Sequence, residues 1–202
     1  SKKIEYGEDS ARYKARVLGE FAYDLGDTLI KPEDIAVALD ANIIPDADEK
    51  VILGVDVARF GKDASVIYEN KGGVLRFVDA NFDPARVTET ANWVHRYAVD
   101  LNATEVRIDA LGIGGGVVDS LMSFTPPPTY TIISMNSNGT TPDRKQWHNA
   151  RAYWWDEFRR NLRLAAIDID PDEESCERLQ DELMSVEYKC SKSTGGLLIE
   201  SK

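Results

Sequence analysis

An aspartate in the middle of an apolar strand, followed by a short glycine-containing loop, constrains this chain more than any other feature. Residues 51–58 read VILGVDVA, so that only apolar or small residues flank Asp56. A short β-branched run of this kind is typical of a buried strand. An ionised carboxylate in such a strand is costly unless a cation or hydrogen bonds compensate its charge. A divalent metal ion is the simplest compensation.

A second segment repeats this pattern. Residues 104–110 read TEVRIDA, and the loop LGIGGG follows Asp109 and Ala110. If the two strands lie side by side, Asp56 and Asp109 approach each other and can bind Mg²⁺ or Mn²⁺, which prefer oxygen ligands. Two such ions would activate a water molecule and stabilise the leaving oxygen in phosphodiester hydrolysis. The alternative is that each acid caps a loop or the helix that follows it.

Composition limits the class of protein. The chain has 202 residues, which fits one domain of ordinary size, and its 43% hydrophobic residues are enough for a core. Its formal net charge of −11 does not suggest a generic nucleic-acid binder, although a local basic patch can serve. Cys176 and Cys190 are too few for a disulfide framework, so we expect free thiols in a reducing compartment. No apolar run approaches the roughly 18 residues of a membrane span.

The order of predicted elements indicates a mixed α/β sheet. The predicted strands lie, in chain order, at residues 51–58, 64–69, 74–80, 104–109 and 129–133. Helices are predicted at about 83–101, 115–123, 147–164 and 172–184, and residues 185–190 form a terminal hairpin with 196–200. The first seven elements read β-β-β-α-β-α-β, a hairpin meander followed by right-handed crossovers. Residues 1–45 are predicted to be an extension, and the acids of 168–174 a solvated charged run.

Several further residues are candidates for the site. Asp63 follows the first strand and is either an additional metal ligand or a turn residue. Gly114 belongs to a glycine-rich turn, which either only shapes the chain or also contacts a DNA phosphate. The turn lacks the Lys-Ser or Lys-Thr ending of an ATP-binding phosphate loop. Candidate contacts to DNA phosphates come from the basic residues Arg59, Lys62, Arg144, Lys145 and Arg151.

Taken together, three segments resemble the nuclease domain of tailed-bacteriophage terminase large subunits. They are VDVARFGKD at 55–63, the stretch 107–116 and LLIESK at 197–202. Residues 13–21, YKARVLGEF, resemble the stretch that joins the ATPase domain of that family to its nuclease. The resemblance implies an RNase H-like fold over 46–202, preceded by a linker (1–45) from an upstream ATPase domain. It also implies a metal-dependent endonuclease that cuts concatemeric phage DNA during genome packaging.

The resemblance assigns roles to particular residues. Asp56 matches the first acid of the family and Asp109 the second, and together they would hold two Mg²⁺ or Mn²⁺ ions. The third acid is expected in a motif beyond Lys202, so this chain is expected to lack the C-terminal helix that carries it. The implied partners are double-stranded DNA, the upstream ATPase domain, the portal and the small terminase subunit, in the host bacterial cytoplasm and without a membrane.

Three other interpretations remain open at this point. The first is another RNase H-like nuclease, such as a resolvase or transposase-type enzyme, with the same two acids. The second is an actin-like sugar kinase or ATPase domain, which ATP-dependent stabilisation would reveal. The third is a non-catalytic DNA-gripping packaging module, which would bind DNA without cleaving it in any metal. Metal-dependent DNA cutting favours either nuclease interpretation.

Overall fold

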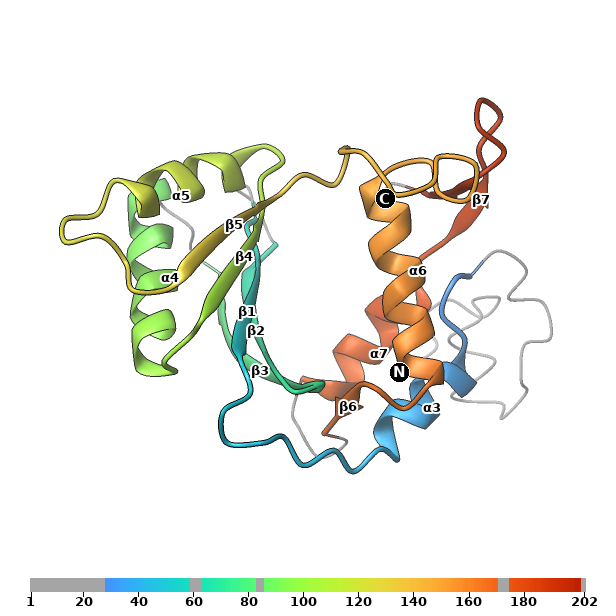
Figure 1. Ribbon diagram of the computed structural model, residues 1–202, viewed down its shortest axis with the longest axis horizontal. Coiled ribbons are helices and arrows are strands. Elements are labelled where there is room, and N and C mark those ends of the chain that lie inside the picture. The colour runs from blue at the N-terminus through green and yellow to red at the C-terminus, as the bar shows by residue number, and fades with distance from the viewer. Residues whose placement is uncertain (1–27, 59–62, 83–85, 171–174, 201–202) are drawn as a thin grey trace, which may run out of the picture.

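The computed structural model describes residues 28–58, 63–82, 86–170 and 175–200, and its centre is a six-stranded mixed sheet (Figure 1). The strands, in the spatial order β5-β4-β1-β2-β3-β6, are Thr131–Met135, Glu105–Asp109, Val51–Asp56, Ser65–Lys71, Val74–Asn81 and Asp168–Ile169. A separate antiparallel hairpin consists of β7 (Tyr188–Cys190) and β8 (Leu197–Ile199). The predicted α/β fold class with a C-terminal hairpin is confirmed.

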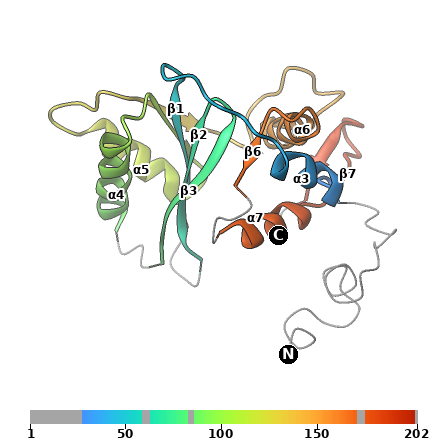
Figure 2. The same cartoon turned by 90° about the horizontal axis from the view of Figure 1, so that it is seen from below.

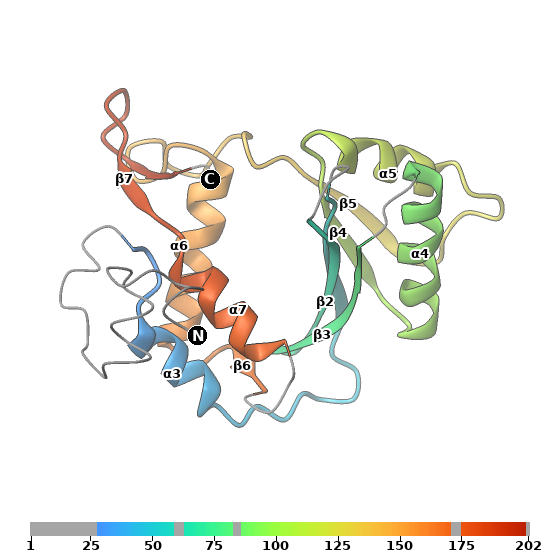
Figure 3. The same ribbon diagram turned by 180° about the vertical axis from the view of Figure 1, so that it is seen from behind.

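Helices lie on both sides of the sheet. Figures 1 and 3 show α4 (Val87–Asp100) and α5 (Ile113–Met122) on one side, and α3 (Pro32–Leu39), α6 (Ala150–Arg163) and α7 (Cys176–Met184) on the other. Within the described ranges, no helix is both long enough and apolar enough to cross a membrane. The predicted order of strands and helices is confirmed with small differences in their bounds, except that the short strand β6 (Asp168–Ile169) between α6 and α7 was not predicted.

Strand β1 lies in the interior of the sheet, and its side chains alternate between the face that packs against α4 and α5 and the opposite face. It runs antiparallel to β2 and parallel to β4, as expected for the first and fourth strands. Alternate residues of β1 and β4 are buried against α4 and α5, namely Leu53, Val55, Val106 and Ile108. Because successive side chains point to opposite faces of a strand, the other face carries Ile52, Gly54, Asp56, Glu105, Arg107 and Asp109.

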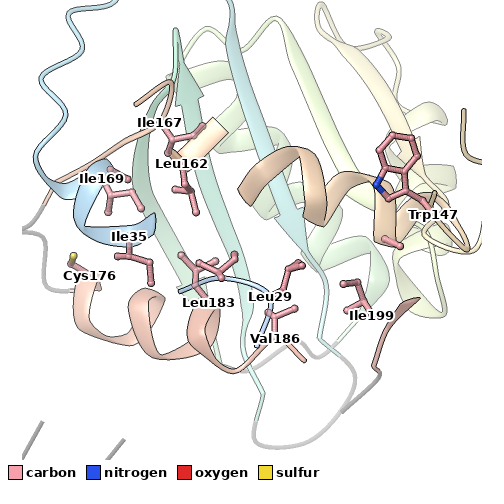
Figure 4. Close-up of a cluster of buried hydrophobic side chains, with 13 residues drawn as sticks. Leu29, Ile35, Trp147, Leu162, Ile167, Ile169, Cys176, Leu183, Val186 and Ile199 are labelled. Atoms are coloured by element: carbon pink, nitrogen blue, oxygen red, sulfur yellow. The ribbon is translucent and has the colours of Figure 1, made fainter. Parts of the chain in front are cut away.

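A second core forms on the far side of the sheet (Figure 4). It joins α3, α6, α7 and the hairpin through side chains such as Ile35, Leu162, Leu183 and Ile199. Trp147 is also buried there. The buried Asp34 accepts a 2.6 Å hydrogen bond from Arg163 Nε and so ties α3 to α6.

The segment from Thr28 to Leu39 belongs to this core, although the sequence assigns it to an extension. Leu29 and Ile30 are almost completely buried, and the Leu29 amide donates a 2.8 Å hydrogen bond to the carbonyl of Val186. The predicted division at residue 45 stays a prediction, and residues 1–27 lie outside the described residues.

Residues 168–174 were predicted to be a solvated charged run. This prediction is wrong for Asp168 and Ile169, which form a strand. Asp168–Ile169 is the edge strand β6, which pairs in parallel with Val74 and Leu75 of β3 and lies between β3 and α3 in Figure 2. Ile169 is fully buried, and Asp168 accepts a 2.8 Å hydrogen bond from the Ile43 amide. A strand of two residues has no periodicity that a sequence pattern can detect. Residues 171–174 lie outside the described residues.

Asp79 on β3 fastens the sheet to α4. Its Oδ2 accepts hydrogen bonds from Trp93 Nε1 at 2.9 Å and from the Tyr97 hydroxyl at 2.7 Å, and its Oδ1 accepts one from the Ala80 amide at 2.8 Å. Partial burial raises the pKa of Asp79, but the three hydrogen bonds outweigh that effect and leave the pKa below its ordinary value of 3.8.

We expect Asp79→Ala to lower the free energy of unfolding by about 1–3 kcal/mol at neutral pH, because three donors lose their acceptor. A depressed pKa stabilises the folded state above the ordinary pKa, and this stabilisation is lost as pH falls through the folded-state value. The difference between wild type and variant should therefore shrink in acid. Urea unfolding at neutral and acid pH measures it, with Asp79→Asn as an intermediate control. An equal loss at both pH values would contradict this account.

Candidate active site

Asp56 and Asp109 are the last residues of two adjacent parallel strands. The register pairs Val55 of β1 with Ile108 of β4. The next residue of each strand is an aspartate, so the two acids lie side by side at the carboxyl ends of these parallel strands. Both side chains lie on the face opposite the buried Val55 and Ile108. The structure therefore brings the two predicted acids together.

The charge of Asp56 is poorly compensated. Asp56 keeps solvent-exposed surface, but the protein atoms crowded around its carboxyl group limit its hydration, and this desolvation is the main cause that raises its pKa above 3.8. Repulsion adds to the effect, first from Asp109 and then from Glu182 and Asp63. Arg151 acts in the opposite direction and is too weak to cancel it. Such a site gains stability from an added cation.

The loop after β4 holds Asp109 in place. The carboxylate Oδ1 of Asp109 accepts a 3.1 Å hydrogen bond from the Leu111 amide, and Gly112 turns the chain at a φ of 68°. Gly114 is buried in the first turn of α5, where a Cβ would lie 1.8 Å from the carbonyl oxygen of Asp109. Glycine is therefore required for the close approach of helix and strand. The DNA contact at Gly114 stays a prediction.

The other predicted residues lie at different distances from the acid pair. Asp63 is exposed just before β2, near enough to raise the pKa of Asp56. Arg144 and Lys145 are exposed in the connection between β5 and α6, and their DNA contacts stay predictions. Arg59 and Lys62 lie outside the described residues.

Two residues from the opposite layer also act on Asp56. Arg151 belongs to the first turn of α6, which Asn149 caps by accepting a 3.0 Å hydrogen bond from the Ala152 amide. Glu182 lies in α7 and accepts a 2.9 Å hydrogen bond from Arg178 Nε. The sequence suggested Arg151 only as one of several basic residues and gave no signal for Glu182, because an acid on the polar side of an amphipathic helix is ordinary.

The donor set fits a hard divalent cation. Within the described ranges there is no group of three or more His, Cys, Asp or Glu side chains that could hold a metal ion. The two adjacent carboxylates nevertheless suit Mg²⁺-like ions, which keep several water ligands and bind through one or two carboxylates and substrate phosphates. The main influences on the Asp56 carboxylate are desolvation and repulsion from neighbouring acids, both of which a bound cation would relieve.

Comparison with known proteins identifies the fold. No family model and no curated protein matches the chain. Its solved structural neighbours are nuclease domains of phage large terminase subunits, so the chain has their RNase H-like fold.

The nuclease domain of the large terminase subunit gp2 of bacterial virus Sf6 superposes with a TM-score of 0.74 at 19% identity, covering 87% of this chain and 88% of that one. A mutant of that domain with manganese and beta-thujaplicinol gives the same TM-score and identity over 86% and 88% of the two chains. The large terminase nuclease of thermophilic phage G20c, with bound cobalt, has a TM-score of 0.58 at 14% identity, over 87% and 88%.

Proposed function

We propose that this chain is the nuclease domain of a phage terminase large subunit and cleaves concatemeric DNA as a divalent-metal-dependent endonuclease. The observation that carries the proposal is the adjacency of Asp56 and Asp109 at one edge of an RNase H-like sheet, with too little positive charge to compensate them. Manganese, calcium, cobalt and zinc accompany the neighbouring nuclease structures.

Each residue has a defined part in this proposal. Asp56 and Asp109 hold two Mg²⁺ or Mn²⁺ ions, and Asp63 is an accessory acid beside them. The bound ions supply an activated water molecule and charge stabilisation at the phosphate being cut. Arg151 acts on Asp56 from α6 and offsets part of its charge. Arg59, Lys62, Arg144 and Lys145 are proposed to contact the DNA backbone.

The proposal also implies a setting. The domain would receive DNA from an upstream ATPase domain of the same polypeptide, together with the portal and the small terminase subunit, in the host bacterial cytoplasm. The large terminase of another thermophilic bacteriophage, 10% identical, shows the same fold within a longer chain, since the match covers 86% of this chain but 39% of that one, at a TM-score of 0.52.

Cleavage of supercoiled plasmid tests the function. The 202-residue chain should nick and linearise plasmid with Mn²⁺ or Mg²⁺ and be inactive in EDTA. The double variant Asp56→Asn/Asp109→Asn, purified in parallel, controls for contaminating nuclease. DNA binding without cleavage in any metal would point either to the third acid expected beyond Lys202 or to the non-catalytic packaging module, and the same assay on a chain extended past Lys202 separates the two. Cleavage that persists in EDTA would contradict the metal-dependent mechanism.

A further inference from the structure

Arg107 shares a sheet face with the two acids. It lies on β4 two residues before Asp109 and is exposed, whereas the intervening Ile108 is fully buried on the other face. Two residues of strand span about 6.6 Å, a separation comparable with that of neighbouring phosphates along one nucleic-acid strand. The backbone position of Arg107 therefore lies about one phosphate spacing before Asp109 along β4, and its hydrogen bonds draw the guanidinium toward Glu105, on the side away from Asp109.

Glu105 and Lys50 hold Arg107 in place, and these three side chains together carry a net positive charge. Arg107 Nε and Nη2 donate hydrogen bonds of 3.1 and 2.7 Å to Glu105 Oε2, and Lys50 Nζ donates one of 3.0 Å to Glu105 Oε1. Two cations against one carboxylate leave one net positive charge. Within the part of the chain that the structure describes, these bonds leave Arg107 Nη1 for a ligand, and the Arg107 side chain keeps 43% of its surface exposed.

The strand residue beside Arg107 is a glycine, so no side chain covers the sheet at that position. The register pairs Arg107 with Gly54 of β1, which in turn pairs with Tyr68 of β2. A Cβ on Gly54 would meet nothing closer than the Tyr68 carbonyl oxygen at 4.0 Å, so glycine is not needed here for packing. A glycine inside a strand often marks close approach of a ligand or another backbone, and on this face Gly54 lies beside Arg107, two residues before Asp56.

We propose that Arg107, held by Glu105 and Lys50, binds a DNA phosphate on the same sheet face beyond the one at the acid pair, and that Gly54 lets the DNA backbone approach the sheet. This inference rests on the proposed nuclease function and names a positioning residue for its substrate. The acids repel the DNA backbone, and Arg107 offsets that repulsion on the same face.

Salt-dependent DNA binding tests the contact. Anisotropy of a fluorescent duplex is measured in EDTA over a range of salt concentrations for wild type, Arg107→Gln, Arg107→Lys and Arg76→Gln. Arg76 is the matched control, because it is an exposed arginine of the same sheet that pairs with Glu69 on the face of Leu53. We expect Arg107→Gln to weaken binding about tenfold at low salt and to reduce the salt slope by about 1. Arg107→Lys should restore the slope, and Arg76→Gln should match wild type.

Gly54→Val tests the bare face independently of charge. Valine suits a strand, so thermal unfolding should be unchanged or improved while duplex affinity falls severalfold and the KM for plasmid cleavage in Mn²⁺ rises. If wild type cleaves plasmid but Arg107→Gln keeps its affinity and slope, this inference is overturned and the nuclease function stands. If Gly54→Val binds DNA like wild type, the backbone does not approach there. If wild type neither binds nor cleaves DNA, both proposals fail.

Discussion

Asp56→Asn is expected to abolish metal-dependent cleavage while making the metal-free protein more stable at neutral pH. The asparagine keeps the size of the side chain but removes the charge that holds the metal. Metal ions supply several kcal/mol of transition-state stabilisation, and each ~1.36 kcal/mol is tenfold in rate, so we expect a loss of about a thousandfold or more. Initial rates of plasmid nicking in Mn²⁺ measure it.

The gain in stability follows from the raised pKa of Asp56. Desolvation, followed by repulsion from Asp109, disfavours the ionised form in the folded state. A raised pKa means that folding is most favourable below the unfolded value of 3.8 and loses stability as pH rises through the folded-state value. Asparagine carries no charge, so the melting temperature of the variant should exceed that of wild type once the pH is above this window.

Added Mn²⁺ should reverse the order of the melting temperatures of wild type and Asp56→Asn. Mn²⁺ binds the folded wild type and raises its melting temperature by mass action, whereas Asp56→Asn should respond little. Asp119→Asn is the matched control, since Asp119 is an exposed acid of α5 outside the acid pair and should behave like wild type in both assays. Full cleavage by Asp56→Asn, or an equal rise in melting temperature with Mn²⁺ in both proteins, would contradict the proposed metal site.

Gly114→Ala is expected to damage both stability and activity. The added Cβ would lie 1.8 Å from the Asp109 carbonyl oxygen, which is backbone and cannot rotate away. Either α5 or the end of β4 must shift, and overpacking of this kind costs about 1–3 kcal/mol or more. A displacement near ~1 Å can cost about a hundredfold in rate, so cleavage should fall at least that much even at temperatures where the variant is folded.

The control for this substitution is Gly116→Ala on the same helix. Its Cβ would approach the Val87 Cγ1 at 3.3 Å, a side-chain contact that can adjust, and alanine favours a helix. Urea unfolding and plasmid nicking should show a clear loss for Gly114→Ala and a small change for Gly116→Ala. Similar behaviour of the two variants would show that the Asp109 backbone tolerates a close neighbour.

Sequence patterns were sufficient to predict a strand or turn where the signal lies within that one element. The apolar runs predicted strands at 51–58 and 104–109 that carry Asp56 and Asp109, whereas the face on which each aspartate lies came from the structure. The glycines after Asp109 marked the turn into α5. The same local signals failed at β6, where two residues pair with β3 and only one of them, Ile169, is buried.

The sequence by itself determined the order of elements from β1 to β5, the place of Asp56 and Asp109 near the ends of two strands, and the need for a tight turn after Asp109. Only the tertiary structure decided that β1 and β4 pair in a register that sets the two acids together, and that Arg151 and Glu182 act on Asp56 from the other layer. It also showed that Gly114 is required by the backbone of Asp109 and that Gly54 leaves the sheet bare beside Arg107. Periodicity and turn chemistry are encoded in a few neighbouring residues, whereas register and layer packing depend on segments far apart in the chain.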